Sequence, residues 1–461
     1  MRSCRPPSCA LAAALVLAAA TSAGAILQAE QRNEVSFLRG PYNLAFFYRH
    51  NDSFRYSAAF HYHHGKQHDV LLLTPLSDHV AVDVEFDADV TRFTYAREAR
   101  TEPTMELFGP YFAQVAWSMY RAIDWTHIHH EQTYDILSDR DIAWPDKSEW
   151  TARAVRHYLD ANPDVALSCA PLDVTMRRAG TMMKPYFTYY RSYYPRSADF
   201  AFVAHWWHPV VYEAMMIAGN DDEQEAVVDE TNRVMLTQVF LDRPQRMLLS
   251  REVMPRYSRM SPESANVFDN LHMLHGIIYD IAAYEGWSDE QKRAELYRVL
   301  EAMRRQPGDE ALARKFRTPH PDMDPRVYEP WMKGYEGEMN RIMEEMMREM
   351  MPLMMPGGMP EAKQREMRRQ LRMKLMPGLE PGEIPGSLHD AMMAVMPDMK
   401  MMPGTMEPGE SAPMMRDAML AGWREKYGDL PDVAPWPMQH EPAAPPVDGV
   451  RAARAEAASE P

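Results

Sequence analysis

The nine residues His272-Met-Leu-His275-Gly-Ile-Ile-Tyr279-Asp280 follow a simple rule: His, two residues, His, three residues, Tyr and then an acid. The rule recurs at His205-Trp-Trp-His208-Pro-Val-Val-Tyr212-Glu213, at His127-Ile-His-His130-Glu-Gln-Thr-Tyr134-Asp135 and, with histidine in place of tyrosine, at His61-Tyr-His-His64-Gly-Lys-Gln-His68-Asp69. A chain of 461 residues with 17 His, 22 Tyr and 66 acids predicts roughly 0.01 such matches by chance. Four copies of the motif therefore require a physical explanation.

A helix brings the marked positions of the motif together. At about 100° per residue, the first, fourth and eighth positions lie within about 60° of one another, and the acid lies beside them. Imidazole and carboxylate are ligands of divalent transition metals, and helical bundles build metal centres from such groups projecting inward. We therefore predict a metal site assembled from several copies, with these candidate ligands: His61, His64, His68, Asp69, His127, His130, Tyr134, Asp135, His205, His208, Tyr212, Glu213, His272, His275, Tyr279 and Asp280.

The competing interpretation is structural. A single His-rich helix is more often a packing helix whose histidines are hydrogen-bonded, but packing alone does not require four copies of an uncommon residue pattern. Three copies also place a helix breaker, Gly65, Pro209 or Gly276, directly after the second histidine, which predicts a bent helix or a close backbone approach. The spacing of the copies, which begin at positions 61, 127, 205 and 272, suits either a duplicated pair or four diverged units.

The rest of the chain predicts a mainly α protein with a helical, bundle-like core at residues 101–316. Helical periodicity is clear in the segments Met105–Leu137, Ser148–Ala161, Ala198–Ala218, Asp221–Asp242, Phe268–Tyr284 and Ser288–Gln306. Residues 26–100 are predicted as a mixed segment containing β-structure, because His79–Tyr95 alternates apolar and polar residues with a period of two. The copy that begins at His61 is the one whose helical placement is least supported.

The N-terminus has the features of a secretory signal peptide at residues 1–25. Arg2 and Arg5 precede an apolar run from Ala10 to Ala20 and a small-residue cleavage pattern, Ala23-Gly24-Ala25. We therefore expect a periplasmic or secreted protein. No later stretch approaches about 20 uninterrupted apolar residues, so no integral membrane segment is expected after signal cleavage.

Composition narrows the chemistry that such a protein can use. Only Cys169 lies beyond the signal peptide, so neither a disulfide framework nor a thiolate cluster is expected, and no Cys-x-x-Cys-His for covalent haem occurs. The net charge of −16 argues against nucleic acid as a partner. Metal chemistry must therefore rely on His, Met, Tyr and carboxylates.

The C-terminal part of the chain is rich in methionine. Between Met339 and Met419 lie 22 of the 39 methionines, within a helical or irregular region at residues 317–427, and a Pro- and Ala-rich tail at 428–461 is expected to be disordered. Thioethers select Cu(I) in a compartment without thiols, whereas a flexible methionine surface can instead bind a protein partner.

These features predict a transition-metal-binding protein, with copper as the metal that fits best and iron, manganese or zinc as alternatives. Three or more histidines per metal favour copper, whereas two histidines with carboxylates favour iron or manganese. The alternative functions are a dinuclear copper, iron or manganese oxidase, a zinc hydrolase, or an interaction protein that docks through the methionine-rich surface. Non-covalent haem would not need the adjacent tyrosine and acid. No Gly-x-Ser-x-Gly or His-Glu-x-x-His signature occurs, so whether the protein is an enzyme stays open.

Overall fold

Four long helices each contain one copy of the motif. The computed structural model describes residues 44–99, 104–179, 189–218, 220–244, 248–315 and 322–327, together with 341, 342, 345 and 346. Within them, the motif helices are α3 (Asn51–Leu73), α6 (Trp117–Ser138), α10 (Pro195–Ile217) and α14 (Pro262–Ala283). The predicted helical core is confirmed, and so is the helical placement of the copy at His61.

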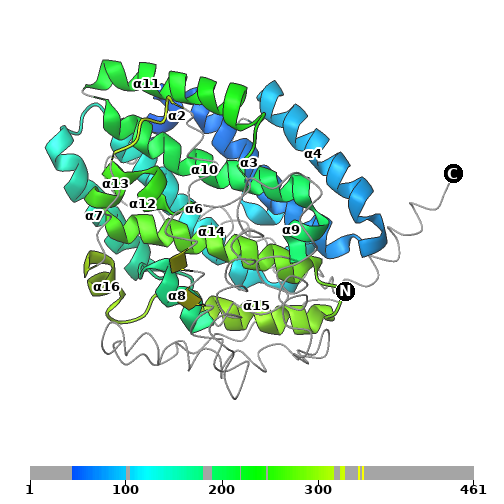
Figure 1. Ribbon diagram of the computed structural model, residues 1–461. Coiled ribbons are helices and arrows are strands. Elements are labelled where there is room, and N and C mark those ends of the chain that lie inside the picture. The colour runs from blue at the N-terminus through cyan, green and yellow to red at the C-terminus, as the bar shows by residue number, and fades with distance from the viewer. Residues whose placement is uncertain are drawn as a thin grey trace, which may run out of the picture.

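The motif helices form the centre of the molecule. α3 and α6 each pack against both α10 and α14, and the nine histidines at the motif positions are all buried. Figure 1 shows α4 and α11 along one side of this centre and α15 along the opposite side. The copies therefore face one another across the helix interfaces, where burial makes any polar atom without a partner costly.

The two halves of the chain repeat the same order of helices. α2 (Ala45–Arg49) and α3 correspond to α9 (Tyr189–Tyr193) and α10, with 5 and 23 residues in both halves. α5 (Pro110–Val115) and α6 correspond to α13 (Pro255–Met260) and α14, with 6 and 22 residues in both halves. α7 (Trp144–Ala161) then follows α6 as α15 (Asp289–Met303) follows α14. Of the two interpretations of the motif spacing, the structure favours the duplicated pair.

Shorter elements complete both halves. They are η1 (Leu76–Asp78), α4 (His79–Ala96), η2 (Met105–Leu107), α8 (Leu172–Ala179), α11 (Asp221–Val234), the π-helical turn η3 (Met235–Val239), α12 (Ser250–Val253) and α16 (Asp309–Lys315). α4 packs on α10 of the second half, and its counterpart α11 packs on α3 of the first half. Each half thus supplies a helix that covers the motif helix of the other half.

The predicted β-strand at His79–Tyr95 is wrong, because this segment is the helix α4. Its buried residues Asp83, Phe86, Val90 and Thr94 recur at helical spacing, whereas Val80 and Val84 are 64% and 47% exposed. The alternating valines suggested a period of two, but the buried face follows a period near 3.6. The described part of residues 26–100 is helical, and the only strand-like pairing in the described ranges is an isolated bridge between Leu167 and Arg304.

Polar caps hold the ends of several helices. A capping box of Ser288 and Gln291 begins α15, and the side chain of Asn220 caps the start of α11. At the end of α6, the buried ammonium of Lys147 donates to the carbonyls of Ile136, Leu137 and Asp139. Lys292, at the same place in α15 as Lys147 in α7, donates to the carbonyl of Ala282 near the end of α14.

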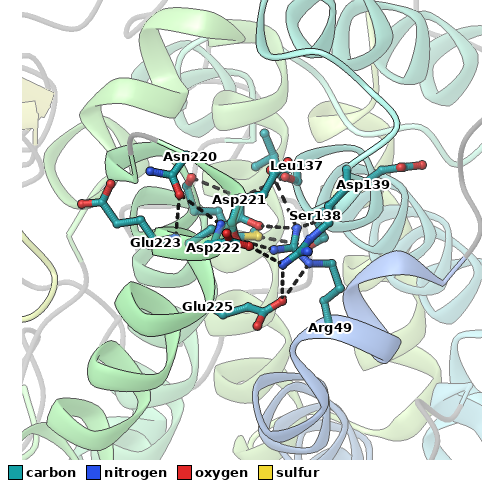
Figure 2. Close-up of polar contacts among 12 residues, drawn as sticks. Arg49, Leu137, Ser138, Asp139, Asn220, Asp221, Asp222, Glu223 and Glu225 are labelled. Carbon is teal, nitrogen blue, oxygen red and sulfur yellow. Dashed lines mark hydrogen bonds and ion pairs between the residues drawn. The ribbon is translucent and has the colours of Figure 1, made fainter.

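Arg49 connects the two halves at the end of α2. Its guanidinium donates to the carbonyl of Ser138 at the end of α6 at 2.5 Å and to the carbonyl of Asp221 at the start of α11 at 2.7 Å. It also lies 3.3 Å from a carboxylate oxygen of Glu225. Figure 2 shows these contacts converging on the one side chain. A single planar cation thus orders three helix ends around the covering helix α11.

The predictions for the chain ends lie largely outside the described residues. The signal peptide, the tail at 428–461 and most of the methionine-rich region belong to this part of the chain. Of the few residues of the methionine-rich region that the structure describes, Met323, Ile342 and Met346 are buried in the main hydrophobic core. None of the described helices combines the length and the apolar character that a membrane crossing requires.

Candidate metal centre

Three histidines from three helices converge at the centre of the molecule. Nε2 of His205 on α10 lies 3.2 Å from Nε2 of His64 on α3 and 3.2 Å from Nδ1 of His275 on α14. All three nitrogens lie within 4.8 Å of one another, and all three side chains are buried. We call His64, His205 and His275 the first histidine group.

The distances in this group match a shared metal ion. Nitrogen ligands at about 2.0–2.1 Å from a tetrahedral ion are separated from one another by about 3.3 Å. A porphyrin between two axial histidines would hold their nitrogens about 4 Å apart on opposite sides of a flat ring. The 3.2 Å contacts between the rings therefore suit a bare ion and leave no space for haem between them.

Hydrogen bonding alone does not satisfy the three rings. Nδ1 of His64 lies 2.6 Å from the carbonyl oxygen of Phe60, which can only accept, so Nδ1 bears the hydrogen and Nε2 bears a lone pair. Nε2 of His205 has a single hydrogen or a single lone pair to offer, yet it contacts a nitrogen of each of the other two rings. A cation in the middle would accept a lone pair from all three nitrogens.

Five more motif histidines lie near the first group, and the rings of four of them stack on another imidazole. The ring of His61 stacks on His127 at a centroid distance of 3.8 Å and on His208 at 4.8 Å. The ring of His130 lies 5.3 Å from that of His208. The ring of His272 stacks on that of His205 at 4.3 Å.

Two tyrosines orient the rings of His208 and His130. The hydroxyl of Tyr134 on α6 lies 3.1 Å from Nδ1 of His208 and donates to the carbonyl of the same residue on α10. In return, the hydroxyl of Tyr212 on α10 lies 3.0 Å from Nδ1 of His130 and donates to the carbonyl of that residue on α6. Because each hydroxyl uses its only hydrogen on a carbonyl, it accepts from Nδ1–H, and the lone pair of each ring is on Nε2.

Each of the four motif acids accepts hydrogen bonds at the start of a short helix. Asp69 accepts from the backbone N–H groups of Tyr111 and Phe112 in α5, and Asp135 accepts from those of Leu44 and Phe46 at α2. The second half repeats this pattern, with Glu213 bound to Arg256 of α13 and Asp280 to Tyr190 of α9. The acids therefore fix the short helices instead of entering the first histidine group.

Burial sets the protonation states around the centre. It raises the pKa of Asp135 and of Glu213 to about 7, although the hydrogen bonds to each carboxylate act in the opposite direction. Burial also lowers the pKa of His64 to about 4 and that of His272 to about 3, and it holds the pKa of the other seven motif histidines well below 6.5. The imidazoles are therefore neutral at pH 7, as metal ligands must be.

His68, the residue that replaces tyrosine in the first copy, adds a further imidazole. Its Nδ1 lies 3.2 Å from the hydroxyl of Tyr120, and its Nε2 is buried with no hydrogen-bond partner among the described residues. A side chain at Gly109 would have its Cβ only 1.9 Å from this hydroxyl, so glycine is required for Tyr120 to reach His68. The motif did not indicate Tyr120, although it lies on the same helix as His127, about two turns before it.

The helix breakers have different roles. A Cβ at Gly65 would lie 3.1 Å from the carbonyl oxygen of Met105, which confirms a close backbone approach at this position. A Cβ at Gly276 would meet no atom within 4 Å of it in the described structure, and α10 continues through Pro209. The three helix breakers therefore do not occupy this motif position for one common structural reason.

Two buried histidines beside the motif positions do not join the first group. Nδ1 of His63 lies 2.7 Å from the carbonyl oxygen of Ala59, and its ring packs against Phe86, Phe93 and Phe200. Nε2 of His129 lies 2.8 Å from the hydroxyl of Ser264. The side chains of His63 and His129 are as buried as those of His64 and His130, but they point in different directions from these neighbours.

No protein-family model, curated protein or solved structure matches this chain. Its site is therefore interpreted from its own geometry.

Proposed function

We propose that this chain is a transition-metal-binding protein that holds its ion at the first histidine group. The observation that supports this proposal most directly is the pair of 3.2 Å contacts that Nε2 of His205 makes with His64 and His275 in a buried site. Uncharged nitrogens with converging lone pairs repel one another in a dry interior, and a cation turns this repulsion into coordination. The protein provides three ligands from three helices of both halves.

We propose copper as the metal. Imidazole suits copper and zinc, whereas iron and manganese sites of helical bundles use carboxylates, and the motif acids here are engaged at helix starts. The 22 methionines between residues 339 and 419 favour copper over zinc, because thioethers bind Cu(I). The N-terminal signal pattern supports export to the periplasm or the exterior, where such a methionine-rich segment can capture or deliver the ion.

A pair of adjacent substitutions tests the proposed site. His64 and His63 are neighbours on α3, and both are buried, but only His64 belongs to the first histidine group. We expect His64→Leu to hold one ion fewer than the wild type and His63→Leu to hold as many as the wild type, as measured by elemental analysis of the purified full chain, with circular dichroism to confirm helical folding. Equal retention of metal by both variants would exclude the site.

A competition experiment tests the identity of the metal. Apo-protein offered Cu(I), Cu(II) and Zn(II) against chelators of known affinity should bind copper more tightly than zinc. A preference for zinc would overturn the copper assignment but leave the site itself intact. A chain truncated before Met359 keeps the buried Ile342 and Met346, so loss of additional Cu(I) equivalents from it would locate these in the methionine-rich segment. If copper binding is unchanged, the segment is a surface for a protein partner instead.

A further inference from the structure

The duplication relates each residue of the first histidine group to another buried histidine. His64 in α3 corresponds to His208 in α10, because both are the second histidine of their copies, and His205 corresponds to His61, the first histidine. His275 in α14 corresponds in the same way to His130 in α6. The counterparts His61, His130 and His208 lie on α3, α6 and α10, so they too come from three helices of both halves.

We propose that His61, His130 and His208, the second histidine group, bind a second ion beside the first. This inference rests on the proposed function, because it extends the same chemistry to the duplicated residues. Two ring distances in one group have a counterpart in the other: His61 to His208 is 4.8 Å where His205 to His64 is 5.0 Å, and His130 to His208 is 5.3 Å where His275 to His64 is 4.9 Å. The third pair is wider in the second group, because His61 and His130 make no ring contact like the one of 5.4 Å between His205 and His275.

The hydrogen bonds of the second group prepare its nitrogens for a cation. Tyr134 and Tyr212 occupy Nδ1 of His208 and of His130, which leaves the Nε2 lone pair of each ring for a ligand. The stacking of His127 on His61 corresponds to that of His272 on His205, at 3.8 and 4.3 Å. Each group therefore has a fourth imidazole beside it, His272 at the first group and His127 at the second, and these two residues occupy equivalent positions in the two halves.

The two groups lie close enough to form a dinuclear centre. His61 and His64 are one turn apart on α3, and so are His205 and His208 on α10, which corresponds to about 4.5 Å along each helix axis. The centre is also asymmetric, since position eight of the motif is His68 beside the first group and Tyr212 beside the second. Ions of one metal in the two groups would therefore have different environments.

Copper(II) titration of the full apo-chain tests this inference, with bound copper measured after desalting and its spin concentration measured by electron paramagnetic resonance. We expect two ions in the wild type and one in His208→Leu. Two neighbouring Cu(II) ions couple magnetically, so the wild type should give less signal per copper than His208→Leu, in which the remaining ion is isolated. His130→Leu should behave like His208→Leu, whereas the adjacent buried control His129→Leu should keep both ions and the coupling.

The outcomes separate the two proposals. One ion in the wild type that persists in His208→Leu and disappears in His64→Leu would overturn the second site and leave the proposed function standing. Two ions that both persist in His208→Leu and in His130→Leu would also overturn the second site. Absence of copper from the wild type would remove the proposed function and, with it, this inference. Retention of helical circular dichroism by either His208→Leu or His130→Leu is sufficient for the comparison.

Discussion

The hydroxyl of Tyr134 donates to the carbonyl of His208 at 3.2 Å and accepts from Nδ1 of the same residue at 3.1 Å. The tyrosine lies on α6 in the first half of the chain, and the histidine lies on α10 in the second half. A phenol of one half therefore determines which nitrogen a histidine of the other half presents. This contact is kept only if α6 of the first half and α10 of the second half hold their positions relative to each other.

Replacing Tyr134 by phenylalanine should weaken metal binding at the second histidine group. The substitution keeps the ring but removes the acceptor that holds the hydrogen on Nδ1 of His208, and loss of such outer contacts costs roughly 10- to 100-fold in metal affinity. Tyr279→Phe is the matched control, because Tyr279 is the counterpart of Tyr134 and its buried hydroxyl has no hydrogen-bond partner among the described residues. Copper affinities of the two variants, measured by chelator competition, should differ, and equal affinities would argue against an orienting role.

Replacing Asp69 by asparagine should lower stability without removing the metal. Both carboxylate oxygens of Asp69 accept backbone N–H groups of α5, and an amide has only one oxygen, so we expect a loss of roughly 0.5–2 kcal/mol in the free energy of unfolding. Asp52→Asn on the same helix is the control, since Asp52 forms only an exposed ion pair with Arg97, typically worth less than about 1 kcal/mol. Urea denaturation and elemental analysis provide the two measurements. Loss of the ion from a folded Asp69→Asn protein would show instead that the acid is a ligand.

Removal of the metal should destabilise the folded protein. An ion that binds only the folded state adds about 4 kcal/mol to the free energy of unfolding when its free concentration is about 1,000 times the dissociation constant. We expect thermal unfolding of the wild type to shift downward after chelation and to recover with copper. The shift should be smaller in His64→Leu, which keeps only the second histidine group, whereas His63→Leu should keep the full shift. A shift of equal size in His64→Leu would place the stabilising ion elsewhere.

His50 should make stability depend on pH. Burial lowers the pKa of His50 to about 4, despite a contact of 3.3 Å between its Nε2 and Oε1 of Gln224. As the pH falls below 6.5, the unfolded chain takes up a proton that the folded chain does not, so stability falls until about pH 4. Between about pH 7.5 and about pH 5 the wild type should therefore lose roughly 2 kcal/mol more than His50→Gln, as measured by urea denaturation in both buffers. Parallel losses would mean that the proton uptake occurs at other groups.

The motif predicted its own helices correctly because its information is local. His, His and Tyr or His at positions one, four and eight share one face of any α-helix, whatever surrounds it, and all four motif segments are helices. The strand prediction at His79–Tyr95 also used a local signal, the period-two alternation of valines, but the helical period of the buried residues is the one that matches the structure. The alternating valines there lie partly on the exposed face, and the residues that face the core, such as Phe86 and Val90, are set by packing on α10.

The chain by itself determined that its histidines would be grouped on helices and that carboxylates would follow them. Only the tertiary structure decided which rings meet and that the acids serve other partners. Asp135 binds N–H groups 89 and 91 residues away, and the first histidine group joins residues 70 and 141 positions apart. The physical reason is that helix periodicity fixes which side chains share a face, whereas the meeting of two faces depends on which helices pack together. Here two duplicated halves pack across each other, and that packing converts four linear motifs into a shared centre.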